Sequence, residues 1–272
     1  MADTFKDIKQ LYSLAGRNYI VTGGAQGIGF AVTQAICQMG GNVAVLDIRT
    51  EPVEAYKSLS SQFNVKTEYF QTDVTKEEDL KSSFEKAIAS LGSLDGLVPV
   101  AGIVVDKPFV EQTWEKVNRI QQTNVMGTFF ATQLAVKQML KQGTPGSIVL
   151  VASLCATQTT PGHRVSGYHA SKGAVLMLAK GLAVELAPQN IRVNSISPGY
   201  TESDMTRKLR EQYPQVIEVM HKVAPMKRIG NVNDLTPAVV YLLSDAAAYT
   251  TSADIQITGG LHAGRIEPNS LD

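Results

Sequence analysis

The chain has few cysteines and no excess of either charge. Its 272 residues include only two cysteines, Cys37 and Cys155, and neither stands in a CxxC or Cys/His cluster. We therefore expect neither a disulfide framework nor a metal site. Basic and acidic residues number 25 each, and the basic residues form no patch in the sequence. This balance argues against a nucleic acid as partner.

Long apolar runs are also missing. No segment reaches the roughly 18 to 20 apolar residues that a membrane-spanning helix needs, and residues 1–10 lack the apolar centre of a secretory signal. We therefore expect a cytoplasmic protein with no membrane partner.

Chains of this length bury roughly three quarters of their unfolded surface in one core. A single domain over residues 1–272 is predicted, with its core at about 14–260 and a polar C-terminal extension over 261–272.

Short apolar runs alternate with longer amphipathic segments along the chain. The predicted strands cover residues 18–22, 42–46, 65–70, 94–100, 147–151, 191–196 and 255–257. The predicted helices cover residues 30–39, 53–63, 76–90, 114–141 and 168–187. This alternation indicates the α/β fold class.

A glycine-rich loop joins the first predicted strand to the first predicted helix. Its residues are Gly23, Gly24, Ala25, Gln26, Gly27, Ile28 and Gly29. The glycines allow a tight turn and a close approach to a pyrophosphate, which the backbone N–H groups and dipole of the next helix would hold. Taken alone, such a loop also occurs simply to pack a helix against a strand.

The second predicted strand ends at Asp47, about 20 residues beyond the loop, where the ribose of a dinucleotide is expected. A carboxylate there accepts a hydrogen bond from the 2′-hydroxyl of NAD and repels the 2′-phosphate of NADP. Gln26 offers no positive charge to that phosphate, and Arg49 is interpreted as a solvated surface charge. The sequence therefore favours NAD and leaves NADP as the alternative.

Tyr168 and Lys172 are four residues apart on a predicted helix, so they share one face. An ammonium near the phenol stabilises the phenolate. An ordinary tyrosine, with a pKa of about 10, is a poor base near neutrality. The pair thus predicts proton transfer beside a cofactor. His169, between them, is interpreted as a variable helix position.

With these motifs the chain resembles the short-chain dehydrogenase/reductase family over about residues 14–260. Thr22 to Gly29 match the TGxxxGxG loop, and Tyr168 with Lys172 match the YxxxK pair. The resemblance implies a Rossmann-type doubly wound parallel sheet with helices on both faces, and NAD(P)-dependent interconversion of a secondary alcohol and a ketone. The implied cofactor-binding residues are Gly23, Gln26, Gly27, Ile28, Gly29, Asp47, Asp73, Val74, Ala101, Gly102, Tyr168, Lys172, Pro198 and Gly199.

The same resemblance implies four catalytic residues. Tyr168 is the general acid/base, and Ser153 positions the same substrate oxygen. Lys172 binds the nicotinamide ribose and, together with the positive nicotinamide ring, lowers the pKa of the tyrosine. Asn124 anchors a water that links Lys172 to solvent.

The chain departs from the family at Pro99-Val100, where two asparagines are usual. Proline cannot donate a backbone hydrogen bond and is unexpected in a central strand. A regulatory or scaffold protein that keeps the dinucleotide site but does little chemistry is therefore an alternative to an enzyme.

The substrate stays open among polyols or sugars, steroids and polyketide-type alcohols. Residues 154–167 are expected to line its pocket, where His163 and Arg164 could bind a polar group. A loop histidine beside an arginine is more often solvated, and Cys155 is interpreted as a small packing residue. Residues 200–230 are predicted to form a substrate lid, the alternative being an ordinary surface helical excursion.

The resemblance also implies a homo-oligomer, a dimer or a tetramer, that pairs through the long helix and the catalytic helix. Apolar side chains of the long helix could supply this contact, but the same residues could face the sheet. They are Val125, Phe129, Leu134, Val136 and Met139.

Overall fold

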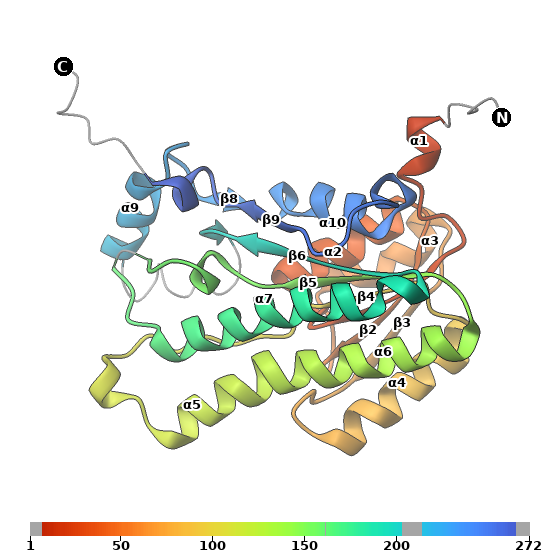
Figure 1. Ribbon diagram of the computed structural model, residues 1–272, viewed down its shortest axis with the longest axis horizontal. Helices are drawn as coiled ribbons and strands as arrows, with labels where there is room; N and C mark the ends of the chain where they lie inside the picture. The colour runs from red at the N-terminus through yellow and green to blue at the C-terminus, as the bar shows by residue number, and fades with distance from the viewer. Residues whose placement is uncertain (1–6, 161, 203–213, 265–272) are drawn as a thin grey trace.

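A seven-stranded parallel sheet forms the centre of the computed structural model, which describes residues 7–160, 162–202 and 214–264 (Figure 1). The strand order is β3-β2-β1-β4-β5-β6-β9. The order reverses between β1 and β4, and such a reversal opens a crevice at the carboxyl ends of the strands. The strands are β1 Asn18–Thr22, β2 Asn42–Asp47, β3 Thr67–Gln71, β4 Gly96–Pro99, β5 Gly146–Val151, β6 Ile191–Pro198 and β9 Asp254–Ile257.

Helices cover both faces of this sheet, which confirms the predicted fold class (Figure 1). Helices α2 and α10 pack together on one face, and α4, α6 and α7 cover the other. The larger helices are α2 Gly27–Gln38, α4 Glu77–Leu91, α5 Trp114–Gln121, α6 Thr128–Gln142, α7 Ser166–Leu186, α9 Pro214–Val223 and α10 Thr236–Leu243; α1 Ile8–Leu11 and α3 Leu59–Phe63 are short. None of the helices in the described ranges is long and apolar enough to cross a membrane.

Two apolar cores lie on the two faces of the sheet. Neighbouring residues of β1 point to opposite sides, so that Val21 joins the core under α2 and α10, whereas Ile20 joins the core under α4, α6 and α7. Because both faces are covered, most of the strands are largely apolar, whereas β3 and β9 also carry polar residues. This is why each of the seven strands is recognisable in the sequence.

The long helix predicted over residues 114–141 is not uniform. It consists of α5 and α6 joined by a π-helical turn, Gln122–Gly127. A π turn adds a residue to the helix and often marks a functional site. Asn124 lies in this turn and is completely buried.

Helix α10 and a pair of short strands were not predicted. Helix α10 is an eight-residue apolar helix that follows a capping box formed by Asn231 and Asp234. A separate pair of short parallel strands, β7 Thr201–Glu202 and β8 Gly230–Asn231, encloses the segment expected to form the lid. Within that segment α9 is described, whereas residues 203–213 lie outside the described ranges.

Pro99 does occupy a central strand, and the hydrogen-bond pattern explains why the strand tolerates it. The ladder between β4 and β1 runs to the pair Thr22 and Pro99, and the next residue, Val100, donates its N–H to the carbonyl of Thr22 at 2.9 Å. Successive residues of a strand bond to alternate neighbours, so the position of Pro99 faces β5. The ladder to β5 already ends at Leu97, and the missing N–H of proline therefore breaks no bond in the sheet.

Candidate active site

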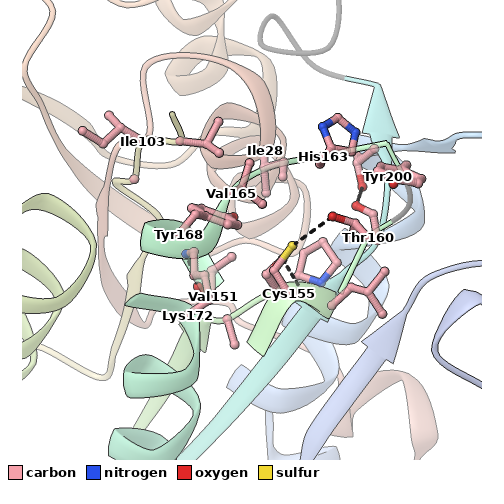
Figure 2. Close-up of a pocket in the computed structure, with 18 of the residues that line it drawn as sticks. Ile28, Ile103, Val151, Cys155, Thr160, His163, Val165, Tyr168, Lys172 and Tyr200 are labelled. Atoms are coloured by element: carbon pink, nitrogen blue, oxygen red, sulfur yellow. Dashed lines mark hydrogen bonds between the residues drawn. The ribbon is translucent and has the colours of Figure 1, made fainter. Parts of the chain in front are cut away.

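The predicted catalytic residues gather at the carboxyl ends of the central strands. Ser153 follows β5, and Tyr168 and Lys172 come from the first turns of α7. All three line one cavity of about 410 Å³, together with Gly102 after β4 and Pro198 and Gly199 at the end of β6. Figure 2 shows Tyr168 and Lys172 at one end of this cavity.

Ser153 and Tyr168 face the same space. The Ser153 hydroxyl accepts a hydrogen bond from the backbone N–H of Cys155 at 3.1 Å, which fixes the side chain at the start of a short 3₁₀ turn. Burial raises the pKa of Tyr168 above its ordinary value, and a hydrogen bond with Ser153 acts in the opposite direction. The pair thus presents a protonated phenol next to a second hydroxyl.

Lys172 lies beside Tyr168, but its ammonium is directed elsewhere. Its Nζ donates to the carbonyl oxygen of Val151 at 2.7 Å and lies 5.7 Å from the centre of the Tyr168 ring. Burial lowers the pKa of this lysine to about 8. In the protein alone burial thus raises the pKa of Tyr168, and the lowering expected from Lys172 together with the nicotinamide ring stays a prediction.

Asn124 acts as a clamp in this structure. Its Oδ1 accepts from the N–H of Ile103 at 2.8 Å, and its Nδ2 donates to the carbonyl of Ile103 and to the Ser171 hydroxyl, each at 2.9 Å. These bonds join the loop after β4 to helix α7. The amide is thus held by protein groups, and its predicted part in anchoring a water stays a prediction.

A second cavity, of about 430 Å³, adjoins the first at the crevice of the sheet. It is lined by ten of the predicted cofactor-binding residues: Gly23, Gln26, Gly27, Ile28, Gly29, Asp47, Asp73, Val74, Ala101 and Gly102. The other four, Tyr168, Lys172, Pro198 and Gly199, line the first cavity. Ile28, Val100, Gly102 and Ile103 line both cavities, so the two spaces are continuous along the loop after β4.

The glycine loop fits a pyrophosphate. Gly23 has φ +70°, and a Cβ there would lie 2.7 Å from backbone atoms of Ala101; a Cβ on Gly29 would lie 2.0 Å from the carbonyl oxygen of Gly23. Only glycine therefore allows this close packing. Helix α2 begins in the loop at Gly27, and the Gln26 side chain does not cap it. Its first N–H groups are thus available to an anion.

Asp47 holds the loop in place and still has acceptor capacity. Its carboxylate is buried and accepts from the backbone N–H groups of Ala25 at 2.9 Å and Arg49 at 3.0 Å. An ionised carboxylate offers about four acceptor positions, which leaves room for a ribose hydroxyl. Arg49 is exposed as predicted, but it is not merely solvated: its Nη1 donates to the Gln26 side chain at 2.9 Å.

Asp73 stabilises the turn after β3. Its Oδ1 accepts from both the N–H and the hydroxyl of Thr75, at 3.0 and 2.6 Å. Asp73 and Val74 therefore form a fixed wall of the second cavity, at the end away from Tyr168.

The loop after Ser153 lines the first cavity, as expected, but one interpretation of it was wrong. His163 is not solvated: its side chain is only 11% exposed, and its Nδ1 lies 2.9 Å from the Oδ2 of Asp106. Arg164 is the more exposed member of the pair, with its side chain 67% exposed and its Nε 3.6 Å from the Oδ1 of Asp106. Cys155 also lines the cavity, and its Sγ lies 3.9 Å from the Thr160 hydroxyl.

Asp106 was missed because nothing in its local sequence marks it. It is separated from His163 by 57 residues, and it follows an apolar loop with no known motif. Only the folded chain brings the two together.

Known proteins resemble this chain over nearly its whole length. A family model described as enoyl-(acyl carrier protein) reductase matches residues 23–262. A 2,5-dichloro-2,5-cyclohexadiene-1,4-diol dehydrogenase from Sphingobium indicum is 33% identical, over 92% of this chain and 98% of its own. A 5-keto-D-gluconate 5-reductase from Escherichia coli is also 33% identical, over 93% and 98%. Among solved structures, an NADPH-dependent 3-quinuclidinone reductase from Rhodotorula rubra has a TM-score of 0.87 at 31% identity, over 96% and 97%.

Proposed function

Because the chain belongs to the short-chain dehydrogenase/reductase family, whose members act on CH–OH groups, we propose that it interconverts a cyclic secondary alcohol and its ketone, with NAD as the preferred cofactor. One observation carries this proposal. The cavity that holds Ser153, Tyr168 and Lys172 shares a wall with the cavity that holds the glycine loop and Asp47. A substrate carbon can thus be held next to the end of a dinucleotide.

The side chains of the first cavity suit proton transfer to and from a substrate oxygen. We assign this proton to the Tyr168 hydroxyl, and we assign to Ser153 a second hydrogen bond to the same oxygen. Lys172 has two ammonium hydrogens beyond the one donated to Val151, which suits it to bind ribose hydroxyls. When bound, the nicotinamide dinucleotide would supply the hydride chemistry.

Asn124 is assigned a positioning role. Its hydrogen bonds to Ile103 hold a loop that lines both cavities. Its hydrogen bond to Ser171 holds the residue that precedes Lys172. A side chain that ties these two segments together fixes the distance between the cofactor space and the substrate space.

The preference for NAD rests on the Asp47 carboxylate, which a 2′-phosphate would approach closely. Relatives support the alternative, NADP-dependent ketone reduction, since the 3-quinuclidinone reductase is named as NADPH-dependent. The guanidinium of Arg49, held at the rim by Gln26, is the group on this chain that would favour that alternative.

The lining of the first cavity favours a ring over an open polyol. Most of its lining residues are apolar, and the polar ones beyond the catalytic residues include Cys155, Thr160, His163 and Tyr200. The apolar residues include Ile103, Val104, Leu154, Val165 and Met220. The names of two relatives, a cyclohexadienediol dehydrogenase and a 3-quinuclidinone reductase, agree with a cyclic substrate.

We also propose a homo-oligomer that pairs through α6 and α7. Phe129 is 41% exposed on α6, and Met177 and Val184 are 63% and 75% exposed on α7, whereas Met139 of α6 is buried against the sheet. The long helix thus presents some apolar side chains to the surface and others to the sheet. Residues 200–230 are kept as a proposed substrate lid, since Met220 of α9 lines the cavity.

The absorbance of reduced nicotinamide tests this function directly. The purified protein is given NAD or NADP with cyclic secondary alcohols, and NADH or NADPH with the matching ketones. Turnover that is faster with NAD is the expected result. Binding of the dinucleotide without turnover of any alcohol or ketone would contradict the proposal and support the regulatory alternative.

A further inference from the structure

One corner of the substrate cavity is polar, and two distant loops build it. Asp106 lies in the loop after β4. Its Oδ2 lies 2.9 Å from the Nδ1 of His163, and its Oδ1 accepts a hydrogen bond from the backbone N–H of Arg164 at 3.2 Å. The backbone N–H of Lys107 donates back to the carbonyl of Arg164 at 3.0 Å. Asp106 and His163 both line the cavity. The corner is thus a fixed part of the cavity wall.

The other ring nitrogen of His163 has no partner. Its Nε2 is buried and makes no hydrogen bond within the described part of the chain. The ring packs on Tyr200, with centroids 5.6 Å apart, so it is held in place. Buried polar atoms of proteins are nearly always hydrogen-bonded. Because His163 lines the cavity, a ligand that displaces the atoms covering Nε2 can supply the missing bond.

Asp106 decides which kind of ligand atom this nitrogen can bind. An ionised carboxylate only accepts hydrogen bonds, so the Nδ1 of His163 must carry the hydrogen. In a neutral imidazole the Nε2 is then an acceptor. It will bind a hydroxyl, which can donate, in preference to a carbonyl, which cannot.

Building on the function proposed above, we infer that His163 binds a second hydroxyl group of the substrate. This group lies at the end of the cavity away from Tyr168, where Figure 2 places His163 beside Thr160 and Tyr200. Asp106 is a positioning residue, because it acts by setting the hydrogen on His163. The substrate class is accordingly a ring hydroxyketone and its diol.

The substitution Asp106→Asn is expected to change the Nε2 of His163 from a hydrogen-bond acceptor into a donor. The N–H of Arg164 donates to the Oδ1 position, so the amide oxygen of asparagine is placed there. Its NH₂ group is then left facing His163 and donates to Nδ1. The imidazole must carry its hydrogen on Nε2, which becomes a donor and favours a carbonyl over a hydroxyl.

The experiment compares two probes, 4-hydroxycyclohexanone and 1,4-cyclohexanedione, as substrates with NADH and with NADPH. Assays run at about pH 8.5, above the ordinary imidazole pKa of about 6.5. The wild type is expected to prefer the hydroxyketone in kcat/KM, and Asp106→Asn to lower this preference by about tenfold or more. His163→Leu should abolish the preference, with cyclohexanone, which has no second oxygen, as the reference ketone for each protein.

Equal losses for both probes in Asp106→Asn would overturn the inference, since a merely structural role does not change preference. The dissociation constants of the probes, measured in the Tyr168→Phe background by the fluorescence of bound NADH, give a readout that needs no turnover. A wild type inactive on all three ketones would contradict the proposed function. In that case, tighter binding of the hydroxyketone than of the diketone, reversed in Asp106→Asn, would support the inference. The absence of this reversal would overturn it.

Discussion

Replacing Asn124 with alanine tests whether this side chain is a clamp. The amide is completely buried and makes three hydrogen bonds, two to Ile103 and one to Ser171. A buried hydrogen bond contributes on the order of 1 kcal/mol, and a buried partner left unpaired costs about 1–3 kcal/mol. We expect Asn124→Ala to lower the free energy of unfolding by about 3–5 kcal/mol.

Thermal unfolding provides the assay. In a chain of this size each kcal/mol lowers Tm by about 2–4 °C, so the expected decrease is roughly 6–20 °C. The matched control is Ser171→Ala, which removes one of the three bonds and should cost about 1 kcal/mol. Below the unfolding transition, Asn124→Ala should mainly raise the KM for cofactor and substrate, because Ile103 lines both cavities.

The opposite pattern would refute this reasoning. A Tm within about 1 °C of the wild type, together with a large fall in kcat at unchanged KM, would mean that the three bonds add little to stability. Asn124 would then act on the proton pathway, as the family resemblance implies.

Three further predictions follow from the site. Tyr168→Phe should lower kcat by about 10²- to 10⁴-fold and leave the Kd of NADH unchanged; retained turnover would contradict its proton role. Asp47→Asn should shift the ratio of kcat/KM for NADP over NAD upward by about tenfold, the equivalent of about 1.4 kcal/mol; an unchanged ratio would remove the basis of the NAD preference. Relative to Lys172→Met, the free energy of unfolding of the wild type should rise between about pH 8 and 10 by on the order of 2–3 kcal/mol, because burial lowers the pKa of Lys172 to about 8 and only the unfolded chain binds its proton in that range. The opposing effect of Cys37, whose pKa burial raises to about 12, is common to both proteins. Denaturant titrations of both proteins measure this difference.

The fold was largely predictable because its strands are buried on both faces. Most of these strands are largely apolar runs, and the sequence predicts all seven within about two residues of their ends. Helix α10 is only eight residues long, too short for its periodicity to be recognised. The π turn around Asn124 was hidden for a different reason: the side chain of Asn124 forms hydrogen bonds with Ile103 and Ser171, which are remote in the sequence.

The candidate site also contains residues that the sequence predicts and residues that it does not. The glycine loop, Asp47 and the Tyr168–Lys172 pair are local patterns whose spacing carries their chemistry, so sequence alone can identify them. The pairing of Asp106 with His163 depends on two loops that meet only in the folded chain. Asp106, the partner that orients His163, therefore escaped prediction, whereas the residues proposed to bind the cofactor did not.

Tyr168 and Lys172 show how far the protein alone prepares the reaction. Burial favours the neutral form of both groups, raising the pKa of the phenol and lowering that of the amine to about 8. A phenolate in this cavity needs additional positive charge close to the ring. The amine is tied to Val151 and does not provide it. Tyr168 is therefore expected to be a weak base in the free protein, and it should deprotonate appreciably only when a cationic group occupies the adjoining cavity.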